Sequence, residues 1–324
     1  MLDAESLYCI IKVMLTIIIL ISVAVFGAYL RRRNIVSENA KQILFQYVYY
    51  IATPAAVIHA LITHQLSSYS QYGKFLLVNA ACYFLVFLAL YKYMKTRKFN
   101  YKAAGVIAYS ANTPNSVFLG FPLILALFHN GTFIYAVLLG TLMDAVLNFF
   151  RIFLLERYKK KSTSSRNKNK KFLLIIKSII NPFLISLVIG LGFVYLKFMP
   201  AENVLKGLGY LGKSASYAAL FVLGLSVGKL KIVKKDKEEL AVITFVKLFA
   251  MPLIVLVAST MFGLSKSAVN AGVFISALPT AIFSLVVAAN LKLDQRLASS
   301  AILITTIVSV VTLPIWYFIL RTIN

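Results

Sequence analysis

The sequence predicts an all-α polytopic membrane protein whose ten transmembrane helices form two inverted five-helix repeats. Hydrophobic residues make up 60% of the 324 residues and charged residues only 14%. The apolar residues form blocks long enough to cross a hydrocarbon core of about 30 Å. A polar, basic stretch divides these blocks into two sets of five. The fourth block of each set carries a proline at a comparable place, Pro114 and Pro279.

Hydropathy and helix length define the ten expected spans. They run approximately over residues 11–30, 41–62, 73–94, 104–128, 133–155, 173–196, 210–229, 240–262, 268–290 and 297–320. The segment before the first span contains Asp3 and Glu5 and lacks the basic start of a secretory signal. We therefore expect the first span to be a retained anchor.

Basic residues predict the orientation of the chain. Most of the 34 lysines and arginines fall in the loops that follow the odd-numbered spans. Loops rich in lysine and arginine stay in the cytoplasm, so both termini should lie outside the cell membrane. Nucleic-acid binding is disfavoured despite the net charge of +24, because it requires a basic face on a folded surface with aromatic residues interleaved.

The longest polar stretch, residues 156–172, is rich in lysine, serine and asparagine. It predicts a basic cytoplasmic linker between a first repeat, residues 1–155 with spans one to five, and a second repeat, residues 173–324 with spans six to ten. Because each repeat has an odd number of spans, the two must enter the bilayer in opposite senses. This is the inverted-repeat arrangement of many secondary transporters.

Spans four and nine are expected to break near their middles, because a proline removes a backbone donor and clashes with the preceding turn. A simple proline kink is the alternative interpretation, but the matched positions and polar neighbours favour a break. Two helix N-termini meeting at the bilayer midplane would favour an anion, particularly a carboxylate. The neutral hydrogen-bonding side chains at these breaks are Asn112, Thr113, Asn115, Ser116 and Thr280.

Several motifs resemble the auxin efflux carrier family, which includes plant auxin exporters and bacterial malate-permease-like carriers. The segment from Pro114 to Pro122, Pro-Asn-Ser-Val-Phe-Leu-Gly-Phe-Pro, is similar to that family's fourth-span crossover. The other matching segments are Thr53-Pro54 through His59, Asn181-Pro182, Lys247 through Pro252, Ala277 through Thr280, and Leu313 through Trp316. Each motif is short, and their order and spacing along nearly the full chain make the resemblance specific.

The resemblance implies a fold like that of the bile acid–sodium symporters. Spans one, two, six and seven would form a scaffold, through which a homodimer is expected, and the other spans would form a transport domain that moves like an elevator. By matching position, the ligand contacts would be Thr53, Asn115 and Asn181, with Pro114 and Pro279 marking the crossover. The long cytoplasmic loop of the plant exporters is absent, which favours a bacterial-type carrier.

Three ionisable residues within spans are candidates for ion coupling. Asp144 lies in the middle of span five, where a carboxylate is usually paired, protonated or functional. Lys247 could face the cavity, pair with an acid or snorkel to the inner surface. His59 either couples protons or is a satisfied interfacial side chain. Gly224 and Gly228 permit close helix approach, either within the protein or in a dimer.

The sequence therefore favours a secondary transporter for a small organic anion, embedded in the lipid bilayer, with coupling to H⁺ or Na⁺ left open. The alternatives are an ion-coupled transporter of a neutral or cationic solute, a channel, and an intramembrane enzyme. An enzyme is disfavoured because the two cysteines and three histidines show no metal spacing or nucleophile–base set. We expect neither a cofactor nor a resident metal.

Overall fold

The computed structural model describes residues 19, 22–63, 69–128, 130–143, 146–147, 182–230 and 236–323. The described part is helical, apart from one isolated β-bridge and connecting turns. Before the linker the elements are residues 22–32, α2 (Glu38–Tyr47), η1 (Val48–Ala52), α3 (Thr53–Thr63), α4 (Tyr69–Thr96), α5 (Tyr101–Ser110), η2 (Ser116–Gly120), α6 (Phe121–Leu127), α7 (Asn130–Leu138) and η3 (Leu139–Met143). After it they are α10 (Pro182–Tyr195), α11 (Glu202–Val227), α12 (Lys237–Phe245), η4 (Val246–Ala250), α13 (Met251–Met261), α14 (Lys266–Ser276), α15 (Phe283–Asn290) and α16 (Gln295–Ile323).

Five helices in the described part are long and apolar enough to cross a membrane. They are Glu38–Thr63, Ser70–Thr96, Glu202–Val227, Lys237–Met261 and Gln295–Ile323. Three shorter apolar helices, Ser116–Leu127, Gly131–Leu142 and Pro182–Tyr195, accompany them. The prediction of an all-helical, multi-pass membrane protein is therefore confirmed at this level. The ten-span inverted repeat stays a prediction, because much of spans one, five and six lies outside the described residues.

Proline shapes three of the apolar helices in the same way. The π-helical turns η1, η2 and η4 each end two residues before a proline, at Pro54, Pro122 and Pro252 respectively. Proline cannot donate to the carbonyl four residues earlier and its ring collides with that carbonyl. A locally widened turn relieves the collision while the helix continues. At η4 the indole nitrogen Nε1 of Trp316 donates to the freed carbonyl of Leu248 at 2.8 Å.

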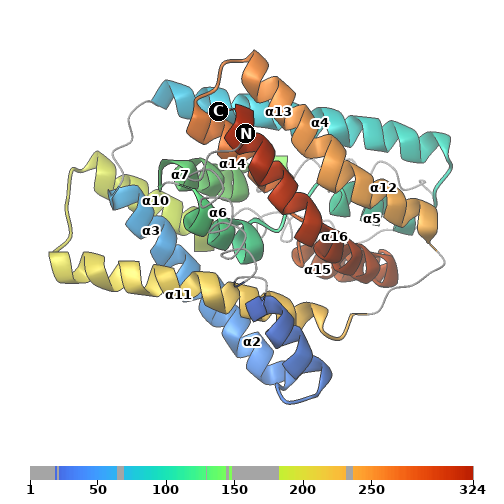
Figure 1. The fold of residues 1–324 in the computed structure, drawn as a ribbon, viewed down its shortest axis with the longest axis horizontal. Helices are drawn as coiled ribbons and strands as arrows, with labels where there is room; N and C mark the ends of the chain where they lie inside the picture. Colours follow the sequence, from blue (N-terminus) through green and yellow to red (C-terminus); the bar gives the residue numbers. More distant parts are fainter. Residues whose placement is uncertain are drawn as a thin grey trace, which may run out of the picture.

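The helices fall into two packing groups, which Figure 1 separates. In the lower left, α3 packs against both α10 and α11, and α2 lies beside α11. In the remainder, α13 packs against α4 and α14, α12 against α16, and α7 against α14. The groups meet where α11 contacts η2 and α6, and where α3 contacts α7. The site described below lies on the side of this boundary that carries α5, α6, α14 and α15.

Small residues hold residues 22–32 tightly against α11. An added Cβ at Gly224 would lie 1.9 Å from the carbonyl oxygen of Ala24, and one at Gly228 would lie 2.6 Å from that of Ala28. These distances leave room for a hydrogen atom only, as in close helix pairs of membrane proteins. Gly224 and Gly228 therefore serve close helix packing within the protein, one of the two roles that the sequence left open for them.

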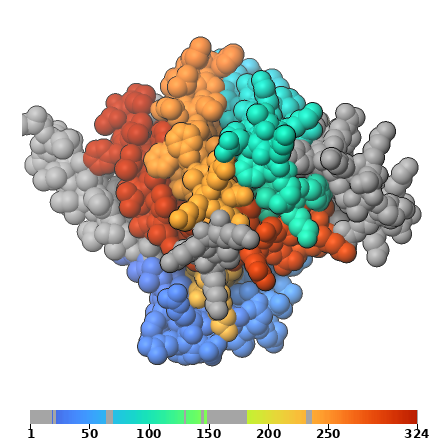
Figure 2. Space-filling model, turned by 90° about the vertical axis from the view of Figure 1, so that its right-hand side faces the viewer, coloured from blue at the N-terminus to red at the C-terminus, as the bar shows by residue number. Residues whose placement is uncertain are grey.

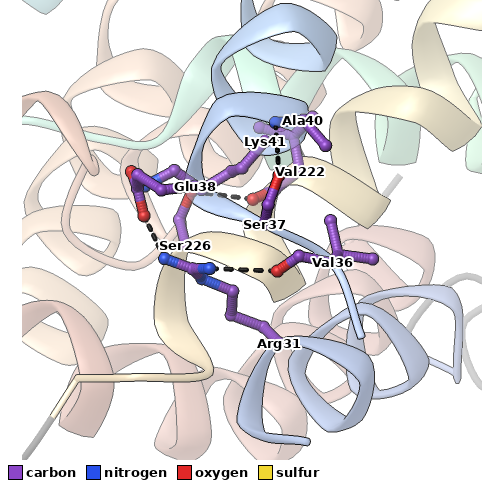
Figure 3. Close-up of polar contacts among 8 residues, drawn as sticks. All are labelled: Arg31, Val36, Ser37, Glu38, Ala40, Lys41, Val222 and Ser226. Atoms are coloured by element: carbon purple, nitrogen blue, oxygen red, sulfur yellow. Dashed lines mark hydrogen bonds and ion pairs between the residues drawn. The ribbon is translucent and has the colours of Figure 1, made fainter. Parts of the chain in front are cut away.

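A buried arginine fixes the turn between residues 22–32 and α2. Figure 3 shows the Arg31 guanidinium donating to the Val36 carbonyl at 3.0 Å and pairing with the Glu38 carboxylate. Glu38 also pairs with Lys41, and the Ser37 hydroxyl caps α2 by accepting from the Ala40 amide at 3.1 Å. The carboxylate thereby balances two of the cations in this basic loop.

Three of the basic loops that the sequence assigns to one side lie at one end of the molecule. The α4–α5 loop, the start of α12 and the α15–α16 loop all lie at the right-hand end in Figure 1, which faces the viewer in Figure 2. At this end Arg97 and Glu238 form an ion pair at 2.8 Å, which joins α12 to the loop after α4. The hydrogen bonds that Arg97 donates to the Glu238 carboxylate raise the pKa of Arg97 above its ordinary value.

Candidate functional site: a crossing of two interrupted helices

Two helices stop in the middle of the molecule, and the chains that leave them cross. α5 ends at Ser110 and α14 ends at Ser276. Pro114 and Thr280 then form an antiparallel bridge, in which the Asn115 amide donates to the Pro279 carbonyl at 3.0 Å and the Ala281 amide to the Thr113 carbonyl at 3.0 Å. Neither proline can donate a backbone hydrogen bond, so the neighbouring residues hold the two chains together.

The last carbonyl of each interrupted helix is capped by a side chain from another element. The Thr280 hydroxyl donates to the Ser110 carbonyl at the end of α5 at 2.8 Å. The Lys247 ammonium donates to the Ser276 carbonyl at the end of α14 at 2.6 Å. The end of a helix carries a partial negative charge, which a hydroxyl proton or a cation stabilises. These caps allow two helix ends to lie in an apolar interior.

Lys247 is fully buried within the described structure, at 0% exposure. It belongs to η4, and the widened turn there is the one that precedes Pro252. The sequence left three positions open for Lys247: in a cavity, beside an acid, or snorkelling to the inner surface. Snorkelling is wrong, because the ammonium points to the end of α14. Its role in ion coupling stays a prediction.

Several polar atoms at the crossing are buried without a hydrogen-bond partner. In the described part these include Ser110 Oγ, Thr113 Oγ1, Asn115 Nδ2 and Ser284 Oγ; Thr53 Oγ1, on α3 in the other packing group, also has no partner. Thr53, Thr113 and Asn115 are at most 2% exposed. An unsatisfied polar group in a membrane interior costs several kcal/mol. Water or a bound ligand is therefore needed to complete these hydrogen bonds.

The other predicted contacts behave differently. The Asn112 side chain donates through Nδ2 to the Tyr83 carbonyl at 2.9 Å, which ties the crossing to α4. Ser116 is buried at the start of η2, and an added Cβ on Gly140 would lie 2.8 Å from its own Cβ. Asp144 and Asn181 lie outside the described residues. His59 is on α3 and lies away from the crossing, beside Gly209 of α11.

Sequence reasoning missed Thr305, whose hydroxyl on α16 accepts from the Thr280 amide at 3.1 Å. A threonine in the middle of an apolar span was the available signal, but many such threonines only bond their own helix. Within the described residues, no group of three His, Cys, Asp or Glu side chains could hold a metal ion.

A cavity of about 440 Å³ lies at the boundary between the two packing groups. Its walls are α3, α6, α7 and α11, and Pro122 of the crossover motif belongs to its lining. The basic residues in its wall are His59 and Lys213, and Thr63, Ser216 and Tyr217 add hydroxyls.

A second cavity, of about 580 Å³, lies among residues 22–32, α11 and α16. Its lining is largely apolar, with Arg32 as its basic residue and with hydroxyl groups from Tyr29, Thr306 and Ser309. Of the two, the first is better suited to a small polar solute, because fixed polar groups in a largely apolar wall give such pockets their orientation and specificity.

Long apolar helices, interrupted helices crossing between two packing groups and buried polar atoms without partners together define a polytopic membrane transporter. The chain matches the family model described as membrane transport protein over residues 9–317. It therefore belongs to that family, the auxin efflux carrier family that the motifs resembled.

Named relatives are transporters in most cases. The chain is 24% identical to "Uncharacterized transporter YfdV" of Escherichia coli K12 over 313 residues, which cover 94% of this chain and 96% of that protein. It is 30% identical over 142 residues, 44% of each chain, to a Rhizobium meliloti protein named "Putative malonate transporter". It is also 27% identical over 311 residues to "Lysosomal cholesterol signaling protein" of Mus musculus, covering 88% of this chain and 34% of that protein.

Proposed function

We propose that this membrane transporter is a secondary carrier of a small organic anion with at least one carboxylate, and that the crossing of the interrupted helices is its binding site. The observation that carries the proposal is the set of buried, unpartnered donors at the crossing, above all Asn115 Nδ2 and the Thr113 hydroxyl, together with the buried Thr53 hydroxyl on α3. Carboxylate oxygens accept hydrogen bonds from such donors. The name of the Rhizobium relative supports a dicarboxylate such as malonate.

Electrostatics at the crossing also favour an anion. The continuation helices begin there, η2 with α6 after Asn115 and α15 after Ile282. The first N–H groups of a helix have no partner within it and carry a partial positive charge. Lys247 adds a buried cation at the end of α14. A neutral or cationic solute would gain nothing from this field, so it is the alternative and not the leading proposal.

The proposed mechanism is alternating access of the elevator type. The group containing α2, α3, α10 and α11 would form the scaffold and the group carrying the crossing would move against it. Supporting this, the two packing groups meet along a restricted boundary, and the 440 Å³ cavity lies in it. The same proposal includes two inverted repeats, residues 1–155 and 173–324, in the plasma membrane with both termini outside. It also includes a homodimer and coupling to H⁺ or Na⁺ through Asp144.

Ligand-induced thermal stabilisation of the purified chain tests the binding site. A ligand that binds only the folded state stabilises it by about 2.7 kcal/mol at 100 times its Kd. We expect malonate or malate to raise the melting temperature of the wild type. We expect Asn115→Ala to lose most of this response while keeping the ligand-free melting temperature, because the removed amide donor has no partner to lose.

Asn79→Ala is the matched control. Asn79 is an equally buried amide on α4 that donates to the Phe75 carbonyl of its own helix at 2.9 Å, so its removal should leave the ligand response unchanged. An Asn115→Ala variant that binds carboxylates like the wild type would contradict the crossing as the site. Counterflow of labelled malonate in proteoliposomes, accelerated by malonate on the opposite side, would separate a carrier from a channel.

A further inference from the structure

Lys213 is a lysine in the middle of a membrane-crossing helix. The expected span over 210–229 already contains it, close to the outer end of that span. In the structure α11 already begins at Glu202 and ends at Val227, and it is one of the helices able to cross a membrane. Lys213 therefore lies about 16 Å along the helix from its start, at 1.5 Å per residue. The four-carbon stem of a lysine is shorter than that distance, and the Lys213 side chain is exposed within the described structure, as expected for a charge that faces an open cavity.

No acidic partner neutralises Lys213 in the part of the chain that the structure describes. The ion pairs there join Arg31 and Lys41 to Glu38, Arg97 to Glu238, and Lys206 to Glu202. Lys206 is on the same helix as Lys213, two turns earlier. A cation at membrane depth without a counter-ion is costly, and such residues usually face an aqueous cavity and mark the path of a substrate or ion.

Lys213 lines the 440 Å³ cavity, and so do two groups able to hydrogen-bond an anion. Ser216 is on the next turn of α11, on the same face as Lys213. His59 faces this wall from α3, where Gly209 makes room for it, since an added Cβ there would lie 3.0 Å from His59 Nε2. The imidazole of His59 interacts electrostatically with the charge of Lys213.

The apolar remainder of the cavity wall strengthens the attraction between Lys213 and an anion. Ala56, Ala60, Leu125, Ala126 and Phe133 make most of the lining apolar, and an ion pair gains more energy in such surroundings than in water. Gly212 fixes the two helices at close range, because an added Cβ would lie 2.8 Å from Ala56 Cα. Because Lys213 follows Gly212 directly, its backbone is held close to α3, one turn of helix beyond Thr53.

We propose that Lys213, with Ser216 and His59, forms a carboxylate-binding subsite in this cavity, on the path of the organic anion to and from the crossing. This rests on the proposed function. The cavity lies between the scaffold group and α6 and α7, and includes Pro122 from the crossing's continuation helix. An anion held by Lys213 would therefore lie at the boundary that the elevator movement changes. A dianion could use Lys213 for one carboxylate, which would favour dicarboxylates over monocarboxylates.

Affinity for malonate measured by thermal stabilisation of the purified full chain tests the subsite. Lys213→Met, which keeps the length of the side chain and removes the charge, should weaken malonate binding at least tenfold. Lys213→Arg should keep most of the affinity. Lys206→Met, on the same helix but paired with Glu202, should bind like the wild type. Added NaCl should weaken malonate binding to the wild type more than to Lys213→Met. Salt screens the attraction between Lys213 and malonate, and the variant lacks this attraction.

A second readout separates binding from a structural role. Removal of an unpaired cation at membrane depth should leave the ligand-free melting temperature of Lys213→Met unchanged or raise it, whereas loss of a structural contact would lower it. Equal malonate affinity in the wild type and Lys213→Met, with Asn115→Ala weakened, would overturn the subsite alone. No stabilisation of the wild type by any carboxylate would overturn both the subsite and the proposed function. If Lys213→Met does not fold, Lys213→Gln provides the same comparison.

Discussion

At the scale of single residues, the crossing depends on side chains that complete the backbone of another helix. Thr280 caps the end of α5 and Lys247 caps the end of α14. Both bonds cross between segments far apart in the chain, so each cap also fixes how one interrupted helix lies against its neighbours. Asn115, Thr53 and Thr113 are the opposite case, because the described chain leaves their polar atoms without partners. Capping and the proposed ligand binding are therefore assigned to different residues.

Lys247→Met tests the cap at the end of α14. The variant keeps the volume of the side chain but leaves the Ser276 carbonyl without its donor in the protein interior. We expect the free energy of unfolding to fall by about 1–3 kcal/mol, the range for a charge-assisted hydrogen bond and for an unsatisfied buried carbonyl. Thermal or denaturant unfolding in detergent measures it.

The control for this variant is Lys237→Met, an exposed lysine at the start of α12 in the same membrane-crossing helix. It should change stability by less than about 0.5 kcal/mol, as surface substitutions generally do. Equal stabilities of Lys247→Met and the wild type would show that the Ser276 carbonyl does not need this cap.

At the scale of helices, proline and glycine decide where the helices widen and how closely they pack. Proline produces a widened turn in η1, η2 and η4, where the helix continues past it. At Pro114 and Pro279 the helix has already ended and the chain crosses another chain. The same residue type therefore gives two structures. The difference is that at the crossing the neighbouring amides find partners across the bridge instead of along the helix.

Gly224→Ala tests the close pair formed by α11 and residues 22–32. The new Cβ would lie 1.9 Å from the Ala24 carbonyl oxygen, and because that atom belongs to the backbone the helices must separate. We expect a loss of about 1–3 kcal/mol or more, as for overpacked interiors. The melting temperature of the purified protein measures this loss.

Gly207→Ala on the same helix is the matched control, because a Cβ there meets no atom of the described chain within 4 Å. It should be neutral or slightly stabilising, since alanine favours a helix by up to about 1 kcal/mol over glycine. A Gly224→Ala protein as stable as Gly207→Ala would contradict the packing of this pair.

At the scale of the whole molecule, the crossing lies beside a boundary between two groups of helices. α3, α10 and α11 form one side and the elements carrying the crossing form the other. The 440 Å³ cavity lies along this boundary. The end of α4, the start of α12 and the α15–α16 loop gather at one end of the molecule with their basic residues. This arrangement fits the positive-inside rule, which would place that end in the cytoplasm.

Cysteine labelling in intact cells tests the orientation. In a background with Cys9→Ser and Cys82→Ala, a membrane-impermeant maleimide should label Ala201→Cys, in the loop before α11. Lys95→Cys, in the last turn of α4, should be labelled only after the cells are permeabilised. The reverse pattern would mean that the termini face the cytoplasm, against the prediction from the basic loops.

Much of the fold could be predicted because its signals are local. Apolar blocks of helical length predicted membrane helices, since the bilayer accepts only backbone that bonds to itself. Matched prolines predicted where two spans are interrupted, and α5 and α14 do end before Pro114 and Pro279. The expected start of α11 was wrong because Lys206, Lys213 and three glycines lower the hydropathy of its first half. Within the protein, that half packs on α3 and lines a cavity.

The sequence by itself determined the membrane class, the helical content, the family resemblance and the polar residues around the two prolines, because composition and periodicity act over short stretches of chain. Only the tertiary structure decided that Thr113 and Ala281, and Pro279 and Asn115, pair across the crossing, that Lys247 caps α14, and that Lys213 lines a cavity with His59. These relations join residues that are distant in sequence. They depend on how closely whole helices approach, which glycines and widened turns set and which no local pattern encodes.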